Sequence, residues 1–176
     1  MKPLQAIAMG LVIVVITASF HGYDALPNPV GWVLVIVGIR GLDVPQRGSL
    51  LAAAGVALVI SAVVWPPAVN AGLQDQDPSL PWAVNLPQVA TAVMLAHALA
   101  QQAFLAEDRK ARRWLLTART LLGVIALLPI LVFGGGLDAL EGTTYVLATL
   151  GMLLLIWLLF SYASRPWAPP GAADQP

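Results

Sequence analysis

Residues 107–133 read EDRKARRWLLTARTLLGVIALLPILVF, a cluster of charged side chains followed directly by a long apolar segment. An α-helix rises about 1.5 Å per residue, so about 20 apolar residues cross the ~30 Å hydrocarbon layer of a bilayer. The apolar part, Trp114–Phe133, has this length. The stretch therefore predicts a transmembrane helix with a basic cluster at its first end.

The composition of the whole chain agrees with this prediction. Of 176 residues, 59% are hydrophobic and only 10% are charged, whereas soluble proteins have roughly 25% charged residues. So few charges cannot cover the surface of a soluble globule, which excludes a soluble enzyme, a disordered chain and a nucleic-acid binder. The chain has no cysteine, so disulfides, thiolate metal sites and cysteine nucleophiles are excluded.

We predict an all-α fold, a polytopic membrane helix bundle with six transmembrane helices and both termini inside (N-in/C-in). A single domain of residues 1–163 is expected, followed by a disordered cytoplasmic tail of residues 164–176, which contains four prolines. The predicted spans are Leu4–Phe20, Pro29–Leu42, Ser49–Trp65, Trp82–Ala106, Trp114–Phe133 and Thr143–Tyr162.

The distribution of charge sets the predicted orientation. With six spans, all nine basic residues fall on one side of the membrane, namely Lys2, Arg40, Arg47, Arg109, Lys110, Arg112, Arg113, Arg119 and Arg165. The other side carries only acidic residues, namely Asp24, Asp75, Asp77, Asp138 and Glu141. An excess of Lys and Arg marks the cytoplasmic side, so that side is predicted to hold both termini.

The second span is short. Pro27 and Pro29 exclude a continuous helix from the first span, and Asn28 is predicted to be an N-cap with Pro29 at the first helical position. The remaining helix to Leu42 measures only about 21 Å. It either crosses with residues 26–28 extended through the outer interface or is a re-entrant half-helix, which requires burial in protein.

The charges favour a full crossing, because a re-entrant second segment would place Lys2 opposite the other eight basic residues. Gly31 and Gly38 are seven residues apart and lie on one helix face. This smooth face is predicted to let a neighbouring helix approach closely.

The entry to this span resembles a known pattern. Residues 24–32, Asp-Ala-Leu-Pro-Asn-Pro-Val-Gly-Trp, resemble a turn found in small bacterial polytopic inner-membrane proteins of no assigned activity. In those proteins Leu-Pro and a short spacer precede Val/Ile-Gly-Trp/Tyr at the start of the second helix. The resemblance implies a multi-pass protein of the bacterial inner (plasma) membrane, and it implies no active-site residue.

Few ionisable side chains lie inside the predicted spans. The absence of Asp, Glu or Lys at depth argues against a proton or cation pathway built on a buried carboxylate. His97 is deep in the fourth span, where its ring could titrate, bind a substrate group or hydrogen-bond a neighbouring helix. The structural role is favoured, because no residue of the spans is predicted to pair with His97. His21 lies on another segment, so no metal site and no cofactor are expected.

The fourth span carries more polar side chains than the others, on two faces, and is therefore predicted to be central in the bundle. The candidate ligand-binding residues are Asn85, Gln88, Thr91 and His97. The alternative is that these side chains only form hydrogen bonds between helices.

No nucleophile paired with a base, phosphate-binding loop or HExxH motif is found, so no enzymatic activity is expected. We predict a non-catalytic module that binds or helps transport a small neutral solute. Its size and topology resemble the substrate-capturing subunits of energy-coupling-factor vitamin transporters, which implies a cytoplasmic ATPase partner. The alternative is a structural protein that packs against a partner membrane protein.

The basic cluster between the fourth and fifth predicted spans is a second candidate surface. Its residues Arg109, Lys110, Arg112 and Arg113 are predicted to face the lipid headgroups or a membrane or cytoplasmic protein partner. Asp108 is expected to face Arg112 one helical turn later. No nucleic-acid partner is expected.

Overall fold

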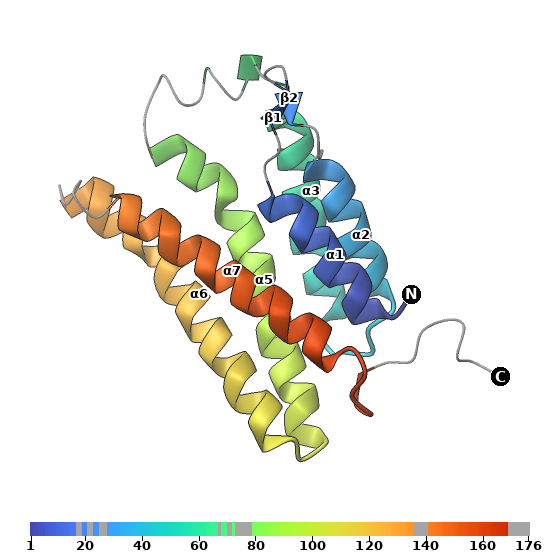
Figure 1. Cartoon of the computed structure of the whole chain (residues 1–176). Helices are drawn as coiled ribbons and strands as arrows, with labels where there is room; N and C mark the ends of the chain where they lie inside the picture. Colours follow the sequence, from blue (N-terminus) through green and yellow to red (C-terminus); the bar gives the residue numbers. More distant parts are fainter. Residues whose placement is uncertain are drawn as a thin grey trace.

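The computed structural model describes residues 1–16, 19–20, 23–24, 28–66, 68–69, 72, 79–135 and 141–168. This part contains six helices of at least 13 residues and one pair of two-residue strands (Figure 1). In chain order they are α1 (Pro3–Val15), β1 (Ser19–Phe20), β2 (Tyr23–Asp24), α2 (Asn28–Arg40), α3 (Arg47–Val64), α5 (Ser79–Leu105), α6 (Arg109–Gly135) and α7 (Glu141–Tyr162).

The six helices form a closed ring. Each of these helices packs against the next one along the chain, and α7 packs against α1 (Figure 1). Side chains from all six helices build one continuous apolar core, in which Ile7, Leu50 and Leu155 are fully buried. The described residues therefore form one helical bundle.

Four of the helices are long and apolar enough to cross a membrane, which confirms the predicted helical membrane fold at this level. These segments are Arg47–Val64, Ser79–Leu105, Arg109–Ile130 and Gly142–Tyr162. Their outward faces carry large apolar side chains, for example Val59, Leu127 and Trp157, each about 60% exposed. A surface of this kind suits hydrocarbon rather than water.

The first helix is shorter than predicted, and the second has the short length expected of it. Helices α1 and α2 have 13 residues each, or about 20 Å. The predicted first span, Leu4–Phe20, extended too far: α1 ends at Val15, and Ser19–Phe20 pairs antiparallel with Tyr23–Asp24. Helix α1 ends within a β-branched run, Val12–Thr17, whose residues have a raised preference for extended backbone.

The backbones of α1 and α2 are in direct contact. A Cβ atom added to Gly31 would lie 2.6 Å from the carbonyl oxygen of Gly10, and one added to Gly38 would lie 2.7 Å from that of Pro3. The predicted glycine face is confirmed. The predicted N-cap bond of Asn28 is wrong, because its Oδ1 atom is buried without a hydrogen-bond partner.

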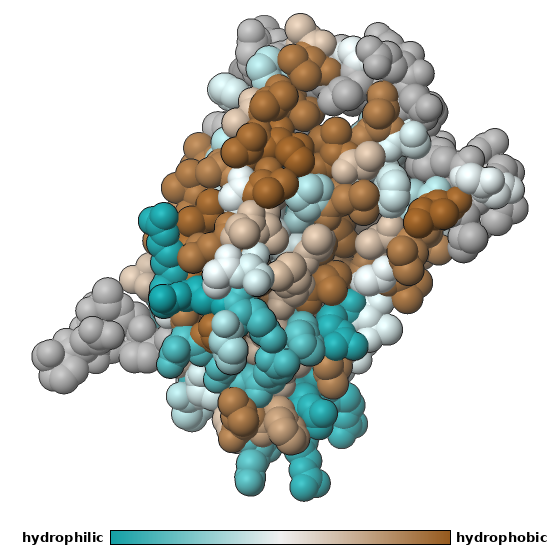
Figure 2. Space-filling model, turned by 180° about the vertical axis from the view of Figure 1, so that it is seen from behind, coloured by the Kyte–Doolittle hydropathy of each residue, from teal (hydrophilic) through white to brown (hydrophobic). Residues whose placement is uncertain are grey.

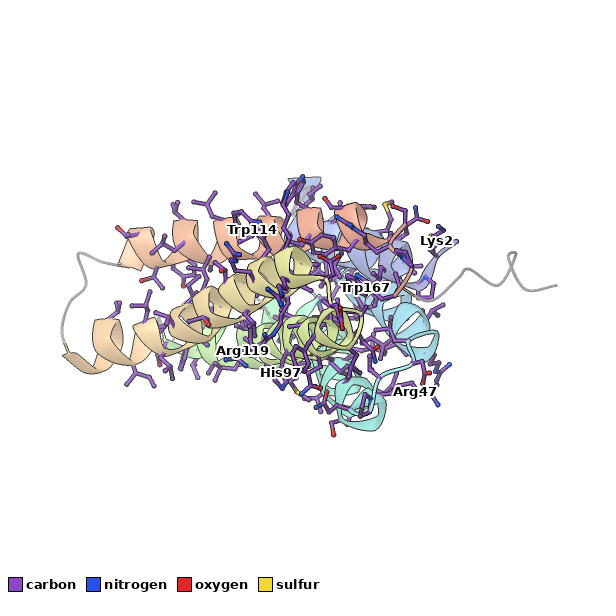
Figure 3. The ribbon with its side chains drawn as sticks, turned by 90° about the horizontal axis from the view of Figure 1, so that it is seen from below. Lys2, Arg47, His97, Trp114, Arg119 and Trp167 are labelled. Carbon is purple, nitrogen blue, oxygen red and sulfur yellow. The ribbon has the colours of Figure 1, made fainter. Side chains whose placement is uncertain are left out.

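Four parts of the chain meet at one end of the bundle. Pro3 lies against Gly41, the Gln46 amide at the start of α3 donates to Gln101 near the end of α5, and Arg165 after α7 pairs with Asp108. Figure 3 looks onto this end. All nine Lys and Arg residues belong to these parts of the chain or to the first half of α6.

The connection between α5 and α6 is a tight turn. Glu107 has a positive φ of 57°, while the Asp108 amide donates to Ala103 and the Glu107 amide to Phe104. This is the Schellman arrangement that ends many helices. The Asp108 carboxylate then accepts from the Ala111 amide as the N-cap of α6.

Part of the predicted tail is packed. Residues 163–168 form turns, and the Trp167 indole donates to the Asp108 carboxylate at 3.2 Å. Within the segment predicted as a disordered tail, Trp167 is partly buried and packs against the apolar core. Residues 169–176 lie outside the described residues.

The contact between α1 and α2 yields a direct test. In Gly31→Ala, the new methyl group would meet the Gly10 backbone, so the helices must separate and the variant should lose about 1–3 kcal/mol of stability. Thermal unfolding in detergent measures this loss.

Gly55→Ala in α3 is the matched control, because nothing lies within 4 Å of its added Cβ. This variant should keep or raise the melting temperature, since alanine favours helix. Equal melting temperatures for the two variants would contradict the backbone contact.

Candidate ligand-binding cavity

A cavity of about 350 Å³ lies between α1, α5, α6 and α7. This volume falls within the ~300–1,000 Å³ range of small-molecule sites. Its walls are mostly apolar, and among the described residues no Asp, Glu, Lys or Arg lines it. The lining residues are Val14, Val15, Trp82, Asn85, Gln88, Val89, Leu122, Ile125, Ala126, Pro129, Val132, Thr144, Tyr145, Ala148, Thr149 and Met152.

Two interior prolines lie on the helices that form this cavity. Pro87 is inside α5 and Pro129 is inside α6, and α5 changes direction along its length in Figure 1. A proline lacks the N–H that the carbonyl four residues earlier would accept, and it bends the helix. Pro129 thus leaves the Ile125 carbonyl without its helical donor, and both residues line the cavity.

The polar side chains of the cavity differ in what they already bind. Asn85 donates to the Pro81 carbonyl at 2.8 Å, and Thr149 donates to the Tyr145 carbonyl at 3.0 Å. Gln88, by contrast, has no hydrogen-bond partner in the described part of the chain. Its amide offers both a donor and an acceptor to a ligand.

The structure separates the four predicted ligand-binding residues. Asn85 and Gln88 line the cavity. Thr91 does not, since it is 1% exposed and donates to the Pro87 carbonyl at 2.7 Å. His97 does not line it either, because it is nine residues past Gln88 on α5, or about 14 Å towards the α5–α6 turn.

His97 belongs to a polar network between helices. Its Nδ1 atom lies 3.1 Å from Arg119 Nη1 on α6 (Figure 3), and its Nε2 atom lies 3.0 Å from the Gln101 amide. Gln101 is in turn bonded to Gln46 before α3. The expectation that His97 has no partner in the spans is therefore wrong.

The guanidinium sets the direction of this network. Arginine can only donate, so the Nδ1 atom of His97 accepts from Arg119. The network joins α3, α5 and α6, which is a structural role.

The pairing of His97 with Arg119 could have been predicted from their positions relative to the turn between α5 and α6. His97 and Arg119 lie at similar distances on either side of the turn at Glu107. Antiparallel neighbouring helices bring such residues to the same depth, where an arginine with no carboxylate within reach takes a ring nitrogen as its partner.

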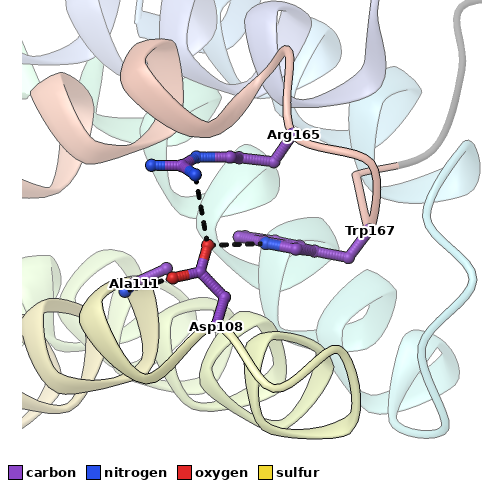
Figure 4. Close-up of polar contacts among 4 residues, drawn as sticks. All are labelled: Asp108, Ala111, Arg165 and Trp167. Atoms are coloured by element: carbon purple, nitrogen blue, oxygen red, sulfur yellow. Dashed lines mark hydrogen bonds and ion pairs between the residues drawn. The ribbon is translucent and has the colours of Figure 1, made fainter.

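Asp108 joins three parts of the chain at the end of the bundle. Its carboxylate accepts from the Ala111 amide at 3.0 Å and from the Trp167 indole at 3.2 Å, and it lies 3.6 Å from Arg165 (Figure 4). These groups, the Ala111 bond foremost, hold the pKa of the Asp108 carboxyl below its ordinary value of 3.8. The predicted Asp108–Arg112 pair is wrong, since Arg112 lies over the Phe104 ring.

This junction has a pH-dependent contribution to stability. Asp108→Ala should cost about 0.5–2 kcal/mol at pH 7, because it removes a helix N-cap. The folded-state pKa is below 3.8, so the stabilisation is complete above 3.8 and disappears as the pH falls through the folded-state value. Unfolding of both proteins across this range measures the difference.

Asp43→Ala is the control, because the Asp43 side chain makes no hydrogen bond to the described residues. It should behave like the wild type at every pH. A constant gap between Asp108→Ala and wild type down to the lowest pH would refute the role of the charged carboxylate.

Comparison of the chain with protein-family models, with curated proteins and with solved structures found no match. The function is therefore inferred from the chemistry of this chain alone.

Proposed function

We propose that this protein is a non-catalytic integral membrane protein that binds, or helps to transport, a small neutral solute in the cavity between α1, α5, α6 and α7. The observation that carries the proposal is a 350 Å³ space, with no charged residue among its described lining, that presents the half-buried amide of Gln88, which has no partner among the described residues. Inside a bilayer little water is available to pair with such an amide, so a ligand or water that bonds to it is stabilised there.

The chemistry of the walls defines the solute class. A charged ligand would lose its hydration without gaining a counter-ion from the described lining, which holds no ionisable acid or base other than the tyrosine hydroxyl. A solute with an apolar body and one amide or hydroxyl group suits the apolar walls and the Gln88 side chain. The freed carbonyl of Ile125 adds an acceptor beside Pro129.

The membrane placement belongs to the same proposal. We assign six crossings, with both termini in the cytoplasm of a bacterial cell and the protein in its inner membrane. The gathering of all nine Lys and Arg residues near one end of the bundle supports this orientation. Helices α1 and α2 alone are short for a crossing. The extended residues of β1 and β2 lengthen each arm, by about 3.3 Å per residue.

Cysteine labelling tests whether the cavity holds water in the membrane. The chain has no cysteine of its own, so Ala148→Cys places a single thiol at the cavity wall. Thiols react with N-ethylmaleimide as thiolates, which need water to form. Labelling should therefore be fast.

The control for this labelling is Ala90→Cys, an exposed position of α5 outside the cavity lining that faces lipid in our account. Its reaction should be at least tenfold slower than that of Ala148→Cys. Equal rates at the two positions would argue against a hydrated site and for the alternative of a packing protein.

The same thiol reports solute binding. A neutral amide- or hydroxyl-bearing solute that occupies the cavity should slow the labelling of Ala148→Cys, and Gln88→Leu should abolish this protection because the ligand loses its polar partner. Gln102→Leu makes the same change on the same helix outside the cavity, where Gln102 donates to the Asp43 carbonyl, and it should keep the protection. Protection that survives Gln88→Leu would exclude this binding mode.

A further inference from the structure

A second hollow lies at the end of the bundle that carries the basic residues. It is an open groove of about 730 Å³ between the end of α5 and the start of α6, hereafter the hairpin groove. Figure 2 shows hydrophilic side chains over this end of the molecule with hydrophobic atoms among them. The groove is lined by Ala103, Phe104, Leu105, Glu107, Arg109, Arg112, Arg113 and Leu116.

The positive charge of the hairpin groove is not neutralised. Three arginines face one carboxylate, that of Glu107. None of these arginines has an ion pair among the described residues, and the neighbouring Asp108 pairs with Arg165 instead. All three arginines belong to the first two turns of α6, where the helix dipole adds further positive potential. The groove therefore favours an anion.

The groove also has an apolar strip. Phe104 is 58% exposed and Leu105 is 73% exposed. The Arg112 guanidinium lies 4.6 Å from the centre of the Phe104 ring, so a cation–π contact holds this charge beside the apolar wall. Trp114 follows directly and is partly exposed, as is common for indoles at the membrane–water boundary.

We propose that the hairpin groove binds an anionic phospholipid, with its phosphate on Arg109, Arg112 and Arg113 and its acyl chain along Phe104, Leu105 and Leu116. A phospholipid has an anionic head that matches the arginines and an apolar tail that matches the apolar strip. Helices α5 and α6 have 27 residues each, or about 40 Å against a hydrocarbon layer of ~30 Å. Their joined ends thus reach the headgroup region, where such lipids are the neighbouring molecules.

Glu107 opposes the positive charge of the hairpin groove. A left-handed φ is unfavourable for a residue other than glycine, yet here a glutamate occupies it. Its carboxylate is the one acidic group of the groove lining and partly offsets the arginines. Its removal is therefore expected to strengthen anion binding.

The test uses the full chain purified in a neutral detergent. Native mass spectrometry and thermal unfolding are followed while palmitoyl-oleoyl phosphatidylglycerol is added, with phosphatidylcholine of the same chains as the neutral comparison. The anionic lipid should bind and raise the melting temperature, and high salt should weaken both effects. The neutral lipid should do neither.

Matched variants place the effect in the groove. Arg112→Gln/Arg113→Gln should weaken phosphatidylglycerol binding about 30-fold, since each basic residue near an anionic lipid contributes about fivefold. Arg40→Gln/Arg47→Gln removes the same charge at the α2–α3 connection, outside the groove, and should leave the affinity within about twofold. Glu107→Gln should tighten binding, which keeps the proposal testable if the arginine variant folds poorly.

Four results would overturn the proposal. The first is equal binding of the two lipids, and the second is an equal loss of affinity in both arginine pairs. The third is displacement of phosphatidylglycerol by an equal concentration of glycerol 3-phosphate, which would mean that the arginines recognise the headgroup alone. Capture of a cytoplasmic protein by the wild type but not by Arg112→Gln/Arg113→Gln, without any effect of the lipid, would assign the groove to a protein partner instead.

Discussion

Inside a bilayer no water is available to pair with backbone N–H and C=O groups, and every other feature of this structure follows from that constraint. Helices satisfy these groups within one segment, so the apolar stretches of the chain become helices, and the irregular connections lie at their ends. The prolines inside α5 and α6 are exceptions that each free one carbonyl. Pro129 and Ile125, whose carbonyl it frees, both line the cavity, where a polar ligand or water can donate to this carbonyl.

The same solvent changes what holds helices together. Lipid tails are as apolar as leucine, so close packing and polar contacts replace the hydrophobic effect between helices. Gly10 and Gly31 provide close packing, because they let the backbones of α1 and α2 touch. The Arg119–His97–Gln101 network provides polar contacts between α5 and α6. Both devices leave the outer faces of the ring free to be apolar.

Much of the fold could be predicted from hydropathy and charge. The last three helices begin and end within a few residues of the predicted spans, and α6 also includes the basic stretch before its span, where the expected helical spacing of Asp108 and Arg112 had already predicted helix. The early end of α1 was missed because hydropathy does not separate an apolar helix from an apolar extended segment. The contact of Trp167 with Asp108 was missed because it joins residues 59 apart in sequence.

The candidate site was predictable only in part. Asn85 and Gln88 could be predicted as site residues because they are polar side chains within an apolar span. That His97 lies outside the cavity and pairs with Arg119 depends on how α5 packs against α6. A sequence gives the depth of a residue in the membrane, whereas the direction of its side chain depends on the rotation of the helix. The cavity itself is a property of four packed helices, and no single segment indicates it.

The membrane crossing of the α1–α2 hairpin is the point on which the topology depends. A re-entrant α2 after a crossing α1 would move Lys2 to the other side, so charge argues against it. If neither α1 nor α2 crosses, all nine basic residues still lie on one side, and charge does not separate this case from six crossings. Labelling of Gly22→Cys, between β1 and β2, by a membrane-impermeant maleimide on intact cells does. The account predicts prompt labelling of Gly22→Cys, and labelling of Gly48→Cys, where an added Cβ meets nothing within 4 Å, only after permeabilisation. A Gly22→Cys protein that stays unlabelled in intact cells but reacts once denatured would contradict six crossings.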